Sequence, residues 1–115
     1  LGTESRVERL KGHTGTVRAL CSYADHLYSG GQDRQLLGWD WREGRPTLLG
    51  NAQGTIWCLA SDSRGLVSAG GDKLVRGPGG VLGEHNGEVR CLALGPGWVA
   101  AAGQDGQIRL HPWSG

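Results

Sequence analysis

Short apolar runs separated by turn residues are the main pattern along this 115-residue chain. Apolar positions gather in residues 16–22, 27–30 and 36–39, and Asp25-His26 and Asp33-Arg34 interrupt them. Turn signals that recur about every eight to twelve residues are typical of an antiparallel meander of short strands. The 22 glycines, in a chain without Phe or Met, agree with strands joined by tight turns. The pattern therefore predicts an all-β fold.

The same pattern occurs three times. Residues 10–33, 49–72 and 82–105 align without a gap. The columns that are identical in all three segments are Leu10/Leu49/Leu82, Gly15/Gly54/Gly87, Leu20/Leu59/Leu92, Gly31/Gly70/Gly103 and Asp33/Asp72/Asp105. Repeats of this size indicate supersecondary units that bury their apolar faces against their neighbours. We expect repeat units at about residues 10–48, 49–81 and 82–113, with residues 1–9 as the outer strand of a preceding unit.

Within each unit, the turns delimit the expected strands. Further strands are expected at residues 66–69, 74–76, 98–102 and 108–110, and a fourth short strand is expected to end at Leu49 and at Leu82. The second unit is shorter than the first, and the shortening falls at Gly77-Pro78-Gly79-Gly80. Glycine accepts positive φ and proline presets a turn, so this segment predicts a tight hairpin. A phosphate-binding loop is disfavoured because neither nucleotide fingerprint is present and no helix follows.

The first unit resembles a WD repeat, because Gly12-His13, Asp33 and Trp39-Asp40 stand at the spacing of that family. The resemblance covers roughly residues 5–113 and weakens after the first unit. The departures are Asn51-Ala52 for Gly-His and Pro78-Gly79 for Trp-Asp in the second unit, and His111-Pro112 for Trp-Asp in the third. The resemblance implies a WD-repeat β-propeller of about three four-stranded antiparallel blades in an incomplete ring.

The resemblance also implies a structural hydrogen-bond network. In this family a His, a turn Asp, a strand Ser or Thr and an indole N–H bond one another inside a blade. The matching positions in the first unit are His13, Ser29, Asp33 and Trp39, and the later units keep Ser68, Asp72, His85 and Asp105.

A Ser, a His and an Asp also suggest a hydrolase triad, so catalysis is the alternative role for these residues. A triad needs an exposed serine, an oxyanion hole and a substrate cleft. The chain has no Gly-x-Ser-x-Gly elbow. The columns also change independently, with Ala52 at the histidine position of the second unit and Ala101 at the serine position of the third. We therefore expect no catalytic residues and no enzymatic activity in this chain.

A partner-binding surface is expected where the first strand of each unit begins. Val17, Ile56 and Val89 are expected to face the packing between blades, and because side chains alternate along a strand, their neighbours should point toward the channel mouth. By resemblance, WD-repeat proteins often contact partners at these positions. The expected partner-binding residues are Arg18, Trp57, Arg90, Thr16, Thr55, Glu88, Gln32 and Gln104.

Arg18, Trp57 and Arg90 carry the sharpest expectation, because Trp and Arg are enriched in binding hot spots. With Glu88 beside them, they suit an acidic or carboxylate-bearing peptide, with the indole as an apolar anchor. The alternative is that Trp57 packs over Cys58 and a neighbouring blade. We expect a non-catalytic scaffold that docks a partner protein or peptide on the channel-mouth face. The alternative function is an accessory propeller domain of a larger enzyme, of the kinase or ubiquitin-ligase type.

Composition narrows the classes of partner and ligand. Twelve Lys and Arg against 11 Asp and Glu leave a net charge of +1, which favours neither nucleic acid nor an anionic membrane. RNA binding through the arginines stays a weaker alternative. The three cysteines lie far apart without a Cys-x-x-Cys pair, so no disulfide framework, zinc site or cofactor is expected. Reduced cysteines favour an intracellular protein, cytoplasmic or nuclear.

Three units are too few to close a ring, because propellers use about four to eight blades. Unpaired strand edges and apolar end faces are an aggregation liability. We expect either that the remaining blades belong to the same longer chain, or that a homo-oligomer closes the ring head to tail. In the second case, residues 6–10 of one copy would complete the blade that ends at Trp113 of the next.

Overall fold

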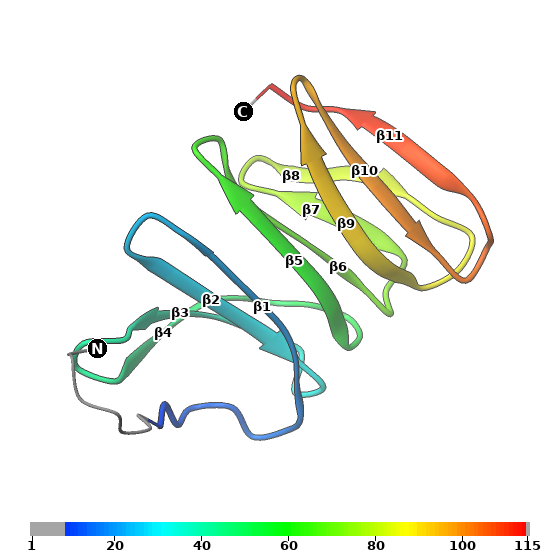
Figure 1. Ribbon diagram of the computed structural model, residues 1–115. Coiled ribbons are helices and arrows are strands. Elements are labelled where there is room, and N and C mark those ends of the chain that lie inside the picture. The colour runs from blue at the N-terminus through cyan, green and yellow to red at the C-terminus, as the bar shows by residue number, and fades with distance from the viewer. Residues whose placement is uncertain (1–8, 115) are drawn as a thin grey trace.

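The computed structural model describes residues 9–114, and every helix or strand assigned in this range is a β-strand (Figure 1). The strands are β1 (Val17–Tyr23), β2 (His26–Gly31), β3 (Gln35–Asp40), β4 (Arg45–Asn51), β5 (Ile56–Asp62), β6 (Gly65–Gly70), β7 (Leu74–Gly77), β8 (Gly80–Glu84), β9 (Val89–Gly95), β10 (Trp98–Gly103) and β11 (Ile108–Pro112). The all-β prediction is confirmed.

Three antiparallel sheets contain these strands. β1–β4 form the first sheet, β5–β8 the second and β9–β11 the third, and within each sheet neighbours in space follow their order in the sequence. The sheets lie side by side as a fan in which β5 lies between β1 and β9 (Figure 1). This is the arrangement of propeller blades that do not close into a ring.

The ends of several strands differ from the sequence prediction. β4 and β8 continue past Leu49 and Leu82 to Asn51 and Glu84, which pair with the first residues of β3 and β7. The strand expected at residues 6–10 falls largely on residues 1–8, which lie outside the described part, and residues 9 and 10 are not in a strand. The hairpin at residues 77–80 is confirmed, because Gly77 and Gly80 face each other where β7 turns into β8.

The main core lies between the second and third sheets. Its fully buried aliphatic side chains are Val67, Val75, Val89 and Val99. β-Branched residues suit this position because they pack well on a pleated surface. Trp113, just beyond β11, closes the outer end of this core and is also buried.

A β-bulge interrupts the first strand of every sheet at its second residue. The register shifts between Val17 and Ala19, between Ile56 and Cys58, and opposite the corresponding residue of β9. The three identical glycines Gly31, Gly70 and Gly103 lie opposite the bulges, where an added Cβ would overlap the backbone carbonyl oxygen of the residue before each strand. Only glycine permits this close backbone approach, which explains that column of the repeat.

The bulge lets residues two apart on one strand face opposite neighbours. Ile56 packs against the first sheet, where a Cβ on Gly30 would come within 2.6 Å of its Cγ2. Cys58 faces the third sheet, with its Sγ 3.9 Å from the Val89 carbonyl oxygen. The expectation that Val17 is packed like Ile56 and Val89 is wrong, because Val17 is 45% exposed while the other two are buried. Val17 occupies the outer face of the first sheet, which no other described sheet covers.

Candidate functional site

The bulges project three side chains from one end of the fan: Arg18 from β1, Trp57 from β5 and Arg90 from β9. We call these residues the bulge row. A bulge adds one residue to a strand and redirects its side chain. Each member is the extra residue at the bulge of its own strand, outside the regular alternation of side chains. Strand alternation alone, the basis of the sequence prediction, does not place it there.

The structure brings the three side chains of the bulge row into contact. The guanidinium carbon of Arg90 lies 3.9 Å from the centroid of the Trp57 ring, and that of Arg18 lies 5.2 Å from it. Both distances fall within the range of cation–π attraction. The indole is half-buried and both arginines are exposed. The row is therefore a preordered stack, in which the arginines cover the ring that was expected to serve as an apolar anchor.

Glu88 completes the stack with a negative charge. The indole N–H of Trp57 donates to Glu88 Oε1 at 2.6 Å, and the same oxygen lies 3.6 Å from Nη2 of Arg90. The four side chains carry two positive charges and one negative charge. Glu88 thereby fixes the orientation of the indole.

The remaining residues of the expected surface line the same end of the fan. Thr16, Thr55 and Glu88 immediately precede β1, β5 and β9, and each offers its carbonyl oxygen to the backbone N–H of a residue before a turn aspartate. These bonds run from Gln32 to Thr16 at 2.9 Å, from Gly71 to Thr55 at 2.8 Å and from Gln104 to Glu88 at 3.0 Å. The Gln104 side chain also accepts from the Glu88 N–H at 3.2 Å. Three equivalent backbone bonds thus hold the residue before each turn aspartate against the residue before a first strand.

A second group of polar residues lies inside the first sheet. His13 Nδ1 is 2.7 Å from Asp33 Oδ2, His13 Nε2 is 2.5 Å from Ser29 Oγ, and the Trp39 indole donates to the same hydroxyl at 2.7 Å. Burial raises the pKa of Asp33, but hydrogen bonds from His13, Gln35 and Thr14 outweigh it and hold this pKa below its ordinary value. Ser29 is only 2% exposed. The Ser29 hydroxyl contacts both His13 and Trp39, and these contacts connect β2 to β3 and to the loop before β1.

The turn aspartate accepts equivalent backbone hydrogen bonds in all three sheets. Oδ1 accepts from the backbone N–H two residues later, at 3.1 Å for Asp33, 3.1 Å for Asp72 and 3.0 Å for Asp105. Oδ2 accepts from a backbone N–H of the loop before the first strand, from Thr14, Gln53 and Asn86. This bridge of turn to loop needs only a carboxylate. It explains why the Asp column is identical although the histidine column is not.

In the second sheet Arg76 partly replaces the missing histidine. Its Nη2 donates to Asp72 Oδ2 at 3.0 Å. Ser68 is buried in the same neighbourhood, with Ala52 and Pro78 at the positions that His13 and Trp39 occupy in the first sheet. Sequence reasoning missed Arg76, although a basic residue four positions after an aspartate was a visible signal.

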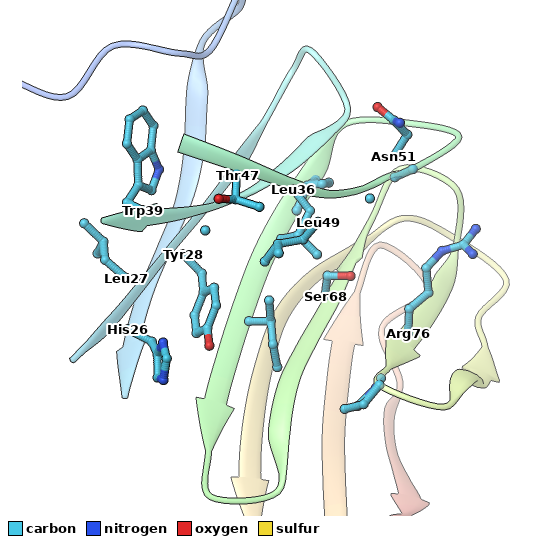
Figure 2. A pocket seen from close by; sticks show the side chains of 17 residues that line it. His26, Leu27, Tyr28, Leu36, Trp39, Thr47, Leu49, Asn51, Ser68 and Arg76 are labelled. Atoms are coloured by element: carbon cyan, nitrogen blue, oxygen red, sulfur yellow. The ribbon is translucent and has the colours of Figure 1, made fainter. Parts of the chain in front are cut away.

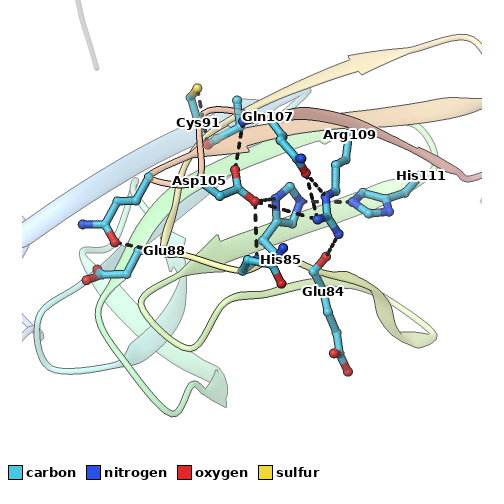
Figure 3. A network of polar contacts seen from close by, with 11 residues as sticks. Glu84, His85, Glu88, Cys91, Asp105, Gln107, Arg109 and His111 are labelled. Carbon is cyan, nitrogen blue, oxygen red and sulfur yellow. Dashed lines mark hydrogen bonds and ion pairs between the residues drawn. The ribbon is translucent and has the colours of Figure 1, made fainter.

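The third sheet holds a different cluster, around His85 and His111 (Figure 3). Their Nε2 atoms are 3.2 Å apart, and His85 Nδ1 lies 3.8 Å from Asp105 Oδ2, too far for a hydrogen bond. Burial lowers the pKa of both imidazoles, and Arg109 lowers both further; Asp105 opposes this at His85. His111 is therefore part of this cluster. It stands in the column of Trp39, and that alignment was the signal available.

No group of three or more His, Cys, Asp or Glu side chains that could hold a metal ion is found within residues 9–114. Cys21, Cys58 and Cys91 are free thiols, and burial followed by the nearby Cys91 raises the pKa of Cys58 to about 12. In the described part of the chain, no helix has the length and apolar character needed to cross a bilayer.

Comparisons with known proteins agree with this architecture. The chain matches the family model described as WD domain, G-beta repeat, over residues 4–40 and 77–111, which is more than half of its length. The stretch between the matches contains most of the second unit, where both family dipeptides are replaced. No curated protein matches the chain.

Two similar solved structures are those of computationally designed proteins. The chain is 24% identical to the Ika8 protein with a TM-score of 0.80, covering 90% of this chain and 35% of that one. It is 18% identical to the Ika4 protein with a TM-score of 0.60, covering 92% of this chain and 96% of that one. The chain thus spans about a third of the Ika8 chain, and identities this low support the fold alone.

Proposed function

This chain belongs to the WD domain, G-beta repeat family, and we propose that it docks an acidic segment of a partner protein on the bulge row. Domains of this family are typically protein-interaction scaffolds, and their repeats are generally non-catalytic. The proposal specifies where the partner binds and which chemistry it presents.

The single observation that carries the proposal is the stack of Arg18, Trp57 and Arg90. Three sheets each contribute one exposed or half-exposed side chain, and these contact one another at 3.9 and 5.2 Å. Because the guanidinium groups rest on the indole, part of their conformational entropy is already lost before a partner binds. A carboxylate that binds here therefore orders fewer side chains than it would on two independent arginines.

The charges select the chemistry of the partner. Arginine offers planar, paired N–H donors that match a carboxylate. Glu88 removes one unit of the positive charge and lies 3.6 Å from Arg90. The surface therefore favours a segment with an acidic group next to neutral or apolar residues over a uniformly polyanionic chain such as RNA. A localised acidic group can approach Arg18, whose guanidinium is farther from the ring centroid than that of Arg90.

The test uses peptides selected on the protein from a random display library. We expect the selected peptides to be enriched in Asp and Glu, and their affinity, measured by fluorescence anisotropy, to fall by about thirtyfold or more in the Arg18→Ala/Arg90→Ala variant. Trp57→Ala should weaken binding similarly, because it removes the support of both guanidinium groups.

The matched control is Arg42→Ala/Arg45→Ala, which removes the same charge from two exposed arginines near the β3–β4 turn. It should leave peptide affinity unchanged. Selected peptides without acidic enrichment, or equal loss of affinity in both double variants, would contradict docking on the bulge row. Thermal unfolding of each variant checks that the fold is retained.

A further inference from the structure

A groove of about 730 Å³ separates the outer parts of the first and second sheets (Figure 2). Leu36 and Leu49 form its wall on the first sheet, and Ser68, Arg76 and Pro78 line the opposite side. Leu49 is 48% exposed, so the apolar wall is open to solvent. The volume falls within the usual range of about 300–1,000 Å³ for binding pockets.

The groove arises from the residues that the second unit lacks. Aligned with the first unit, Ala52 takes the place of His13, and Pro78 takes the place of Trp39. The hairpin at residues 77–80 also shortens β7 to four residues and β8 to five. Two rings are therefore absent beside Ser68, and Ala52 and Pro78 both line the space.

Two polar groups at the groove lack partners. No hydrogen bond to the Ser68 hydroxyl is found among residues 9–114, although Ser68 is only 8% exposed. The Nε atom of Arg76 is buried and has no acceptor within the described part of the chain. In Figure 2 the Ser68 side chain lies between the labelled side chains of Leu49 and Arg76. Buried polar groups in proteins are normally paired, so a Ser68 hydroxyl without a partner at the groove suggests a ligand that completes it.

The first sheet indicates which chemical group of a ligand would fit the groove beside Ser68. There, Ser29 stands in the column of Ser68, and its hydroxyl accepts the indole N–H of Trp39 at 2.7 Å. We propose that the groove binds the tryptophan side chain of a partner segment, with its indole N–H donating to Ser68 Oγ. The ring then packs between Pro78 and the leucines of the first sheet.

The dimensions of the groove favour a tryptophan within a peptide over a free indole. The space is larger than one bicyclic ring, and His26, Thr47 and Asn51 extend its lining beyond the apolar centre. β4, which contributes Thr47 and Asn51, is the outermost strand of its sheet, so its outer backbone groups can pair with an extended segment. This site is separate from the bulge row and can be tested without it.

The first test is a ¹⁹F NMR titration of the protein with a blocked pentapeptide that carries 5-fluorotryptophan between alanines. We expect saturable broadening and a chemical shift change. The same peptide with 5-fluoro-1-methyltryptophan, which has no indole N–H, should bind about threefold to tenfold more weakly. Free 5-fluoroindole should bind more weakly than the peptide; equal binding would overturn the peptide assignment, and absence of binding by the tryptophan peptide would overturn the site.

Two variants and one control locate the binding. Ser68→Ala should reduce the affinity of the tryptophan peptide to that of its 1-methyl analogue. Ala52→His should abolish binding, because an imidazole at this position would form a hydrogen bond with the Ser68 hydroxyl, as His13 does with Ser29. Ser63→Ala, in the exposed β5–β6 turn, should leave the affinity unchanged. Unchanged affinity in Ser68→Ala, with the fold verified by its melting curve, would overturn the proposal.

Discussion

The first and third sheets build different polar clusters from the same alignment columns. In the first, both ring nitrogens of His13 are hydrogen-bonded, to Asp33 and to Ser29. In the third, Ala101 and His111 replace the serine and the tryptophan, so His85 meets a second imidazole, and its Nδ1 is buried without a hydrogen bond among the described residues. Arg109 lies beside this pair, where its cation opposes protonation of both rings (Figure 3).

The difference shows which parts of the network the fold requires. The bonds from the turn aspartate to the backbone are present in both sheets, whereas the His–Ser–Trp contacts exist only in the first. Backbone bridges hold the turn against the loop, and side-chain contacts add stability to it. We infer that the third cluster makes the stability of the fold depend on pH, because burial lowers the pKa of both His85 and His111.

The largest difference in stability between the two sheets is expected for variants of the turn aspartates. Asp33→Ala should lower the free energy of unfolding by about 3 kcal/mol, because it leaves the buried His13 and two backbone N–H groups without their acceptor. Asp105→Ala should cost less, since its distance to His85 is already 3.8 Å. Urea unfolding of both variants measures the two losses. Equal losses would show that the two clusters do not differ as described.

The serine column should show a smaller contrast. Ser29→Ala should cost about 2 kcal/mol, because the Trp39 indole and His13 both lose a partner in a buried site. Ala101→Ser should change stability by less than about 0.5 kcal/mol, since its hydroxyl gains a bond to His85 while entering a packed core. Differential scanning calorimetry can compare the variants. Unchanged stability in Ser29→Ala would show that the Ser29 hydroxyl does not contribute to the network.

The pH dependence of stability should come from the third sheet. Because the pKa values of His85 and His111 lie below the ordinary 6.5, the unfolded chain binds more protons than the folded chain between the lowered values and 6.5. Stability should therefore fall as the pH decreases from about 7.5 to about 5.5. Urea midpoints across this range should vary less in His111→Gln. The matched control is His26→Gln, which changes an exposed histidine outside this cluster.

The smallest expected difference in stability concerns variants of the residue after each turn aspartate. It adopts a positive φ in all three sheets, 66° at Arg34, 69° at Lys73 and 75° at Gly106. Arg34→Gly should therefore stabilise by up to about 1 kcal/mol, whereas Gly106→Ala should destabilise by a similar amount. Melting temperatures that move the other way would show that interactions of the Arg34 side chain outweigh its backbone conformation.

The repeat and its turns made the fold predictable from the sequence. The glycine and aspartate columns marked the turns, and the alternation of apolar runs gave strands close to their observed positions. The bulges could not be predicted from alternation, since a bulge breaks the period of two by one residue. The exposure of Val17 was missed for a related reason: its column is buried only where a preceding sheet packs against it.

For the candidate site, the grouping of the bulge row was predictable from the sequence, but its geometry was not. Alignment columns placed Arg18, Trp57 and Arg90 in one row, yet the sequence did not indicate that both arginines rest on the indole or that Glu88 accepts its N–H. Those contacts depend on the distance between neighbouring sheets. The groove beside Ser68 was missed as well, because it results from absent side chains. In the sequence, Ala52 and Pro78 at the positions of His13 and Trp39 indicated only that the repeat motif was lost.

The most direct test of docking on the bulge row is site-specific photo-crosslinking. The test variant carries a photo-reactive amino acid in place of Gln104, next to the bulge row. The control variant carries the same amino acid in place of Glu43, near the β3–β4 turn. Both positions are exposed. We expect an acidic peptide selected on the protein to crosslink at position 104 and not at position 43. Crosslinking at position 43 alone would contradict the account and place the partner on another face.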